Sequence, residues 1–183
     1  MKILVLGGTG LLGSHLVPKL LARGYDVTVL SRNSAAPSEL ENQGVKSILG
    51  DLLDPDAFIP SLTPQDVVVS IAMPLEFGRM SQKKFEIVSE RTTKFTRSAL
   101  NIGYKLECPI IFTLGTSYMT GPGEVADETW PIERFGLTLA GIDAERLIHT
   151  AGAEGWSTAT INMVNVGHSL DVHLTSPVGP YIL

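Results

Sequence analysis

The chain has 183 residues and a mass of 19.7 kDa, with 44% hydrophobic and 18% charged residues. This length supports one domain with a real core but not two full ones, and the charged fraction lies below the about 25% of typical soluble domains. A net charge of -5 and a pI near 5.3 argue against a general nucleic-acid or anionic-membrane binder, and the apolar content excludes intrinsic disorder.

The single cysteine, Cys108, excludes an internal disulfide framework and a cysteine-based zinc cluster, and it predicts a reducing, cytoplasmic setting. We interpret Cys108 as a small residue at the start of a buried strand rather than as a nucleophile. No apolar run approaches the ~20 residues of a membrane helix. The apolar run after Lys2 is too short for a signal peptide, so we expect a chain that begins directly with structure.

Short apolar runs alternate with helical patterns along the chain. The expected strands are rich in Val, Ile and Leu, as in strands covered on both faces, and they cover residues 2–6, 26–30, 46–49, 66–72, 110–114 and 157–162. Helices are expected over residues 11–23, in a short segment after Pro55, and over residues 81–103 and 132–153. The rhythm predicts a three-layer α/β domain with a doubly wound parallel sheet, a Rossmann fold of strand order 3-2-1-4-5-6 with right-handed crossovers.

Two later stretches do not follow this rhythm. Residues 115–131 carry Gly, Pro, Thr and acidic residues and are expected to form a loop. The tail after residue 166 contains an alternating, strand-like stretch at residues 170–174, followed by two prolines.

The strongest local pattern is the glycine turn Gly7-Gly8-Thr9-Gly10-Leu11-Leu12-Gly13, between the first expected strand and the first expected helix. It satisfies both G-x-G-x-x-G and G-x-x-G-x-x-G spacing. Early glycines permit a tight turn and close approach to a pyrophosphate, and the last glycine lets helix and strand pack closely. The N–H groups and dipole at the helix start favour the anion. A tight strand-to-helix turn alone also needs glycines, but the flanking elements favour dinucleotide binding.

Arg32 follows the second expected strand, where a carboxylate would bind the ribose 2′-hydroxyl of NAD. No carboxylate stands there, and the planar guanidinium of Arg32 suits a 2′-phosphate, which favours NADP(H). The alternative is an exposed loop arginine without a ligand.

Further motifs follow the glycine turn along the chain. They are Gly50-Asp51-Leu52, the strand that enters Met73-Pro74, residues 110–113 leading to a Ser/Thr-containing segment that ends at Gly121, and Asp127-Glu128. With the glycine turn, this set resembles the extended and atypical short-chain dehydrogenase/reductases, the NAD(P)-dependent sugar epimerase/dehydratase superfamily, from Met1 to about Gly167. The resemblance implies that Asp51 and Leu52 flank the adenine and that Ala72 lies beside the dinucleotide. A turn cap is the alternative role for Asp51.

Members of this family typically use a Tyr-x-x-x-Lys pair with a Ser or Thr. Thr116 falls at the Ser/Thr position, but Leu137 stands where the tyrosine belongs and Gly141 where the lysine belongs. No tyrosine of the chain has a lysine four residues later. Tyr118 could substitute as the acid, although a tyrosine there is more often a packing or gating residue.

The resemblance, together with Arg32, predicts an NADP(H)-binding protein related to NAD(P)-dependent sugar epimerases, dehydratases and reductases. We expect one NAD(P)-binding domain over residues 1–183, with a core at 1–166 and a short tail at 167–183, no metal site, and the C-terminal substrate segments of the family largely missing. If the protein is catalytic, hydride is transferred at a hydroxyl or carbonyl carbon. The alternatives are a non-catalytic NADP(H)-sensing regulator of the NmrA-like kind and a truncated, decayed family member. A homodimer through helices 81–103 and 132–153 is a further expectation, because relatives often pair there.

Overall fold

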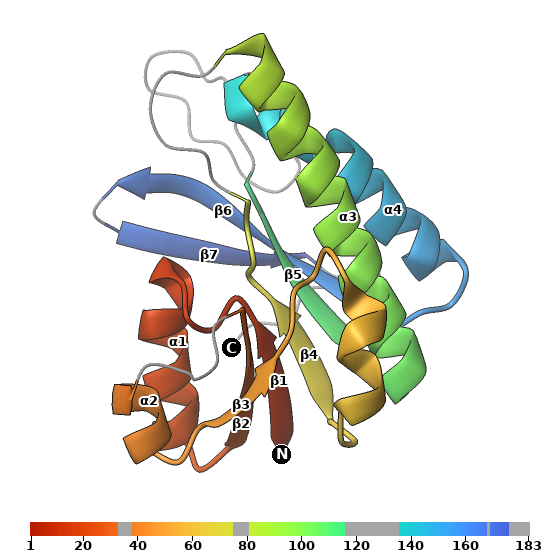
Figure 1. Cartoon of the computed structure of the whole chain (residues 1–183). Helices are drawn as coiled ribbons and strands as arrows, with labels where there is room; N and C mark the ends of the chain where they lie inside the picture. The colour runs from red at the N-terminus through yellow and green to blue at the C-terminus, as the bar shows by residue number, and fades with distance from the viewer. Residues whose placement is uncertain (33–37, 75–80, 116–135, 168, 176–183) are drawn as a thin grey trace.

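The protein folds around one seven-stranded sheet of order β3-β2-β1-β4-β5-β6-β7 (Figure 1). The computed structural model describes residues 1–32, 38–74, 81–115, 136–167 and 169–175. β1 to β6 run parallel, and β7 pairs antiparallel with β6. The strands are β1 (Lys2–Leu6), β2 (Asp26–Ser31), β3 (Lys46–Leu49), β4 (Val67–Ser70), β5 (Ile110–Gly115), β6 (Thr158–Gly167) and β7 (Ser169–Thr175). The predicted Rossmann fold and its strand order 3-2-1-4-5-6 are confirmed.

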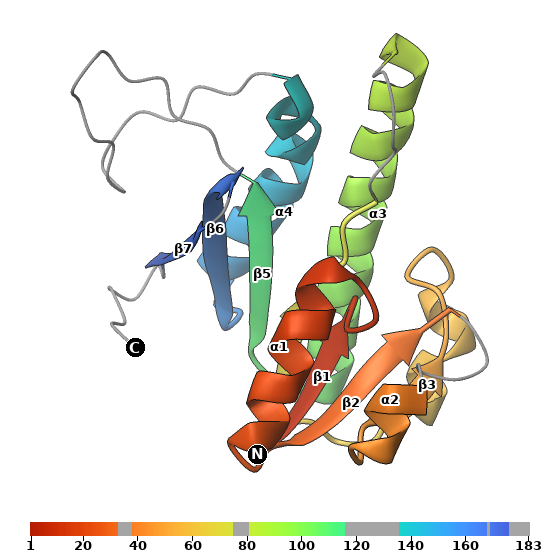
Figure 2. The ribbon, with the colours of Figure 1, turned by 90° about the vertical axis from the view of Figure 1, so that its left-hand side faces the viewer.

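Helices cover both faces of the sheet and form the outer two of three layers (Figure 2). On one face lie α1 (Leu11–Ala22) and α2 (Ser38–Asn42). On the other lie α3 (Gln82–Leu106), α4 (Ile142–Ala153) and the 3₁₀ segments η1 (Pro55–Ala57), η2 (Ile59–Ser61) and η3 (Gly136–Gly141).

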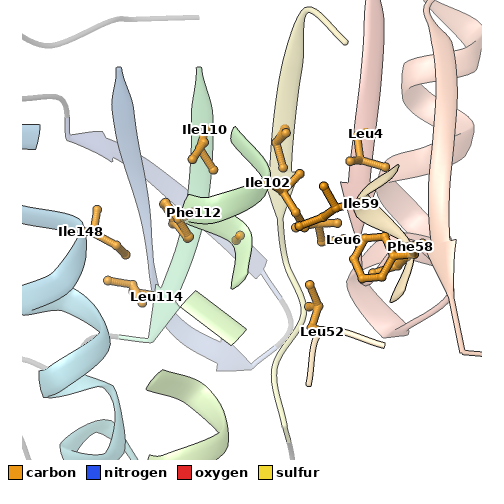
Figure 3. Close-up of a cluster of buried hydrophobic side chains, with 13 residues drawn as sticks. Leu4, Leu6, Leu52, Phe58, Ile59, Ile102, Ile110, Phe112, Leu114 and Ile148 are labelled. Atoms are coloured by element: carbon orange, nitrogen blue, oxygen red, sulfur yellow. The ribbon is translucent and has the colours of Figure 1, made fainter. Parts of the chain in front are cut away.

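Alternate residues of the buried strands supply two separate hydrophobic clusters. In β1, Ile3 and Val5 pack beneath α1, whereas Leu4 and Leu6 face α3. Figure 3 shows this second cluster, where Ile102 of α3 and Ile148 of α4 meet the strand residues. Apolar side chains are needed on both faces because each face is covered, which explains the runs without strict alternation.

Several predicted boundaries were wrong. The helix expected over residues 132–153 begins only at Ile142, after the 3₁₀ segment η3, and residues 132–135 lie outside the described residues. Glycines at both ends of η3 disfavour an α-helix there. The short helix expected after Pro55 is instead two 3₁₀ turns, since Pro60 lacks the backbone donor that a continuing α-helix would need. The third helix extends three residues beyond the predicted end at Gly103 and stops at Glu107, whose φ is 52°.

The tail contributes to the sheet. The alternating residues 170–174 lie within β7, which pairs with β6 from Thr160 to Gly167. α2 had no counterpart among the predicted elements, and the loop expected over residues 116–131 lies outside the described residues.

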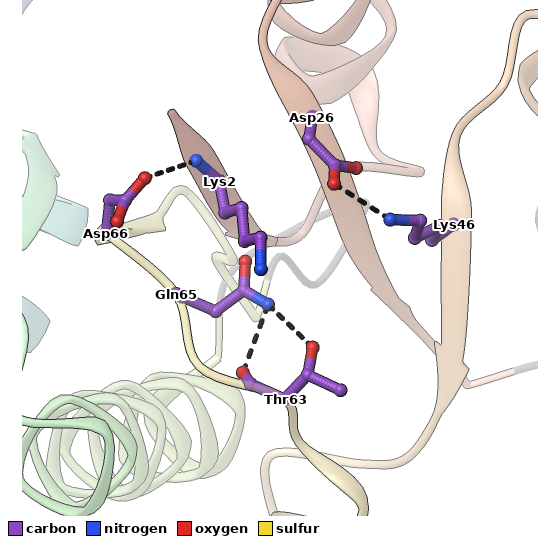
Figure 4. Close-up of polar contacts among 6 residues, drawn as sticks. All are labelled: Lys2, Asp26, Lys46, Thr63, Gln65 and Asp66. Carbon is purple, nitrogen blue, oxygen red and sulfur yellow. Dashed lines mark hydrogen bonds and ion pairs between the residues drawn. The ribbon is translucent and has the colours of Figure 1, made fainter.

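Polar contacts join neighbouring strands at the edge where the parallel strands begin (Figure 4). The backbone N–H of Lys2 donates to Asp66 Oδ2 at 2.6 Å, and Lys46 Nζ lies 2.8 Å from Asp26 Oδ2. The amide nitrogen of Gln65 donates to Thr63, while Gln65 Oε1 is buried without a hydrogen-bond partner. This edge therefore carries structural contacts, whereas the motifs found in the sequence gather at the opposite edge.

Candidate functional site

The sequence motifs meet at the carboxyl edge of the sheet, where β1, β2, β3 and β4 end side by side. Gly7 follows β1, Arg32 follows β2, Gly50 and Asp51 follow β3, and Ala72 lies two residues after β4. The chain leaves β1 toward α1 on one face and leaves β4 toward α3 on the other (Figures 1 and 2). Ligands of open α/β sheets bind where adjacent connections diverge in this way.

Two glycines of the turn are required by close backbone contacts. Gly7 has φ +94°, and a Cβ there would lie 2.7 Å from the backbone nitrogen of Ala72. A Cβ on Gly13 would lie 2.2 Å from the carbonyl oxygen of Gly8, so α1 packs directly on the turn that precedes it. The predicted steric roles of an early and a late glycine are both present, and Ala72 lies directly against the turn.

The start of α1 is exposed and carries no competing negative charge. Gly10 is its N-cap, no side chain caps it, and its first turn contains no acidic residue. Thr9 is exposed, Leu12 is half-buried, and Leu11 is 75% exposed. A helix start of this kind can hold an anion through its N–H groups and dipole.

Arg32 and Asp51 occupy different local environments. Arg32 is exposed immediately after β2. The carboxylate of Asp51 accepts a hydrogen bond from the Leu53 N–H at 2.9 Å, and its backbone oxygen accepts one from Asp54 at 2.9 Å. Asp51 therefore does cap a turn, and the cap fixes the direction of a carboxylate beside the carboxyl edge.

Leu52 is buried, with 4% of its surface exposed, and packs with Phe58 in the cluster beneath α3 (Figure 3). Ala72 is half-buried beside the glycine turn. The side chain of Leu52 thus contributes to the core, while the backbone at that position remains part of the Asp51 turn.

The structure does not describe the two residues expected to carry catalysis, but it describes the two positions expected to correspond to the family's tyrosine and lysine. Thr116 and Tyr118 lie outside the described residues. Leu137 falls in η3, and Gly141 is the N-cap of α4, with open space where a Cβ would project. Neither residue offers a group that can transfer a proton.

Met73, part of the motif that follows β4, is 42% exposed three residues after that strand. Ser98, by contrast, is not among the candidate residues found in the sequence. Ser98 is 7% exposed on the inner side of α3 and donates from Oγ to the Leu52 carbonyl at 2.6 Å. The position of Ser98 next to Ala99 on the core-facing side of α3, which also carries Thr96, was the available signal for Ser98.

No group of His, Cys, Asp or Glu suited to a metal ion occurs within the described parts of the chain. No helix in those parts is both long and apolar enough to span a bilayer. Cys108 is half-buried just before β5, and burial, helped by the negative charge of Asp66, raises the pKa of its thiol. A raised pKa keeps the thiol protonated and supports the structural interpretation of Cys108.

Solved structures share this architecture. UDP-glucose 4-epimerase from Thermus thermophilus, in complex with NAD, superposes with a TM-score of 0.71 at 23% identity, over 88% of this chain and 54% of that one. Vestitone reductase from alfalfa gives a TM-score of 0.69 at 23% identity, over 88% of this chain and 56% of that one. Identities this low establish a common fold.

Sequence relatives extend the comparison. "Putative dihydroflavonol 4-reductase" from Synechocystis sp. is 46% identical over 97% of this chain, which covers 49% of that protein. Photosystem II assembly factor Ycf39 from Cyanophora paradoxa is 42% identical over 38% of this chain and 22% of its own length. The chain spans about half or less of the length of these relatives. The model of the NAD dependent epimerase/dehydratase family matches residues 3–166. The chain belongs to the NAD dependent epimerase/dehydratase family.

Proposed function

We propose that the protein binds NADP(H) across the glycine turn. The observation that carries this proposal is the backbone geometry at Gly7 and Gly13, where side chains are excluded and an uncapped helix start is exposed. A pyrophosphate needs both close backbone approach and free donors. Thr9 to Leu12 would line the phosphates, Asp51 and Leu52 would flank the adenine, and Ala72 would lie beside the dinucleotide.

Arg32 supports NADP(H) over NAD(H). It follows β2, the position from which Rossmann proteins recognise the adenosine ribose, and a guanidinium can bind a 2′-phosphate through two parallel hydrogen bonds. We expect Arg32→Ala to weaken NADPH binding at least about tenfold and to change NADH binding less than about twofold, because only NADPH carries the 2′-phosphate.

Fluorescence titration of the purified chain with NADPH and NADH measures both affinities. Arg23→Ala is the matched control, because Arg23 is also exposed but lies just past the carboxyl end of α1, away from the motif edge. A wild-type chain that binds neither nucleotide would overturn cofactor binding. Equal losses for NADPH and NADH in Arg32→Ala would overturn the role assigned to the 2′-phosphate.

Hydride transfer at a hydroxyl or carbonyl carbon is the proposed reaction. Thr116 would donate a hydrogen bond to the substrate oxygen, and Tyr118 is the candidate proton donor. Thr116→Ala is expected to abolish NADPH-dependent turnover of a panel of carbonyl compounds while leaving NADPH affinity unchanged. Retained turnover would remove Thr116 from the site, and Tyr118→Phe tests the proton donor in the same assay.

The second candidate function is non-catalytic NADP(H) sensing. Leu137 and Gly141 at the positions of the family's proton-transfer pair favour it specifically. The two functions separate in one experiment: saturable NADPH binding without turnover of any panel member supports sensing, and turnover supports the enzyme.

A homodimer through α3 and α4 is supported by the shape and charge of their outer side. Two neighbouring hollows of about 610 and 400 Å³ lie along α3, and Lys94 and Arg97 line both. The larger hollow also reaches Leu52, Ser98 and Trp156. We call them together the outer groove. Its half toward the start of α3 carries Glu86, Glu90 and, from α4, Asp143. A second copy related by a two-fold axis would place the acidic residues near the start of one α3 against Arg97 of the other.

A further inference from the structure

Ser98 makes a long-range polar contact from the inner side of α3. Its side chain is 7% exposed, and Oγ donates to the carbonyl of Leu52, 46 residues earlier, at 2.6 Å. Hydroxyls of the same helix behave differently: Thr92 donates to Val88 and Thr93 to Ser89, each four residues back. Ser98 instead joins the helix to the turn that follows β3.

Other contacts that hold this turn come from β2, from within the turn itself and from the core. The Gly50 N–H donates to the Ser31 carbonyl at 2.9 Å, and the Asp51 carboxylate caps the Leu53 N–H. Phe58 lies beneath Gly50, where a Cβ would come within 2.5 Å of its ring. Leu52 anchors the turn by its side chain in the core (Figure 3). Within the described residues, the hydrogen bond from Ser98 is the polar contact that joins the carbonyl of Leu52 to a distant element.

The direction of the Asp51 carboxylate depends on this turn. Its cap needs the Leu53 N–H in place, and that N–H belongs to the peptide unit whose carbonyl is the acceptor for Ser98. The peptide between Leu52 and Leu53 is planar, so holding its oxygen also orients its N–H. Loss of the bond would leave a buried carbonyl without its partner and free the peptide to rotate.

We propose that Ser98 is a positioning residue for the adenosine half of the cofactor, acting through the Leu52–Leu53 peptide on the Asp51 carboxylate. The inference rests on the proposed binding of NADP(H) with Asp51 beside the adenine. Ser98 itself touches the turn and not the nucleotide, so its effect is on the geometry that the adenosine meets.

The test compares Ser98→Ala with wild type for NADPH and for 2′,5′-ADP, which contains the adenosine half without the nicotinamide. Both affinities are expected to fall by the same factor, about three- to tenfold, because the damage is confined to the adenosine end. Amide hydrogen exchange gives a second readout without cofactor: the Leu53 and Asp54 amides should exchange faster, while those of β1 stay protected.

Thr92→Val is the matched control, since it removes a hydroxyl of the same helix that bonds only within the helix. Ser98→Cys keeps the size but donates poorly; it should reproduce the Ala effect and replaces that variant if Ser98→Ala does not fold. Unchanged affinities together with unchanged Leu53 exchange would overturn the inference. Wild-type protein that binds neither nucleotide would overturn it together with the proposed function, while faster exchange in that case would still show that Ser98 holds the turn.

Discussion

Glycines that look equivalent in the sequence differ sharply in what surrounds them. A Cβ on Gly13 would lie 2.2 Å from the Gly8 carbonyl oxygen, whereas a Cβ on Gly141 would meet nothing within 4 Å. Backbone atoms of a buried turn cannot move aside as the end of a flexible side chain can. The two positions therefore form a natural pair for testing how tightly the first turn is packed.

Gly13→Ala is expected to destabilise the protein by about 3 kcal/mol, at the upper end of ordinary overpacking, because the clash is with backbone. Gly141→Ala should stay within about 0.5 kcal/mol, as an open site with ordinary backbone angles allows. Urea unfolding followed by circular dichroism measures both. Similar stabilities for the two variants would contradict the packing described for the glycine turn.

The thiol of Cys108 offers a pH-dependent readout at the same scale. Burial, and then the charge of Asp66, raises its pKa in the folded protein. Alkylation by iodoacetamide requires the thiolate, so the reaction in native buffer should have its midpoint at higher pH than in the guanidinium-unfolded chain. Because the pKa of the thiol is higher in the folded than in the unfolded protein, deprotonation of Cys108 favours unfolding. The free energy of unfolding should therefore begin to fall as pH rises above the pKa of the unfolded thiol, and it should continue to fall up to the pKa of the folded one. Matching midpoints in the two states would contradict this assignment.

At the scale of elements, the strands of the sheet were predictable from the sequence, and the helical segments that cover the sheet were less so. β1, β2, β3 and β5 match their predicted ranges to within one residue. β1 and β2 are buried on both faces, which leaves an apolar run, whereas the edge strand β3 is mostly exposed. η3 was missed because helical spacing of apolar residues does not reveal where glycines shorten a helix. β6 was expected to end at residue 162 and extends to Gly167, since pairing with β7 continues its ladder. The role of Ser98 could not be predicted from the sequence, because its hydrogen-bond partner is the backbone carbonyl of Leu52, 46 residues earlier.

The contact between α3 and the loop after α4 can be measured directly. Tyr104 and Trp156 stack with ring centroids 4.7 Å apart and an interplanar angle of 24°. A double-mutant cycle of Tyr104→Ala and Trp156→Ala should give a coupling energy of about 0.5–1.5 kcal/mol. Tyr25→Ala, on the opposite face of the sheet, should combine additively with Trp156→Ala. Additivity in both cycles would show that the stack contributes nothing beyond its separate parts.

At the scale of the whole molecule, the cofactor half of the family's architecture is the part this chain encodes most clearly. The family match covers residues 3–166, and the structure brings the glycine turn, Arg32, Asp51 and Ala72 to one edge. In the alignment expected from the sequence, Leu137 and Gly141 stand at the positions of the family's proton-transfer pair. The proposed dinucleotide binding and the proposed hydride transfer therefore need separate assays, and a binding assay does not depend on turnover.

The outer groove predicts how two copies would associate. Arg97 lines both hollows and forms no ion pair among the described residues, while Glu86 lies at the acidic end of the same helix side. In an antiparallel pairing of α3 helices with the two-fold axis midway between Glu86 and Arg97, close to Thr92, these two charges would face each other across the interface. Arg97→Glu would then place like charges together and weaken the dimer about tenfold or more.

Sedimentation velocity at low and high salt measures this equilibrium. The double variant Glu86→Arg with Arg97→Glu should recover most of the affinity, because reversing both charges restores opposite signs. Lys19→Glu is the matched control, since it makes the same charge change on α1, across the sheet from the groove. Salt should weaken the wild-type dimer and strengthen the Arg97→Glu dimer, because screening reduces attraction and repulsion alike. A wild-type chain that remains monomeric at 100 µM, a concentration of the order at which weak homodimers form, would overturn the dimer, and an equal loss in Lys19→Glu would place the interface elsewhere.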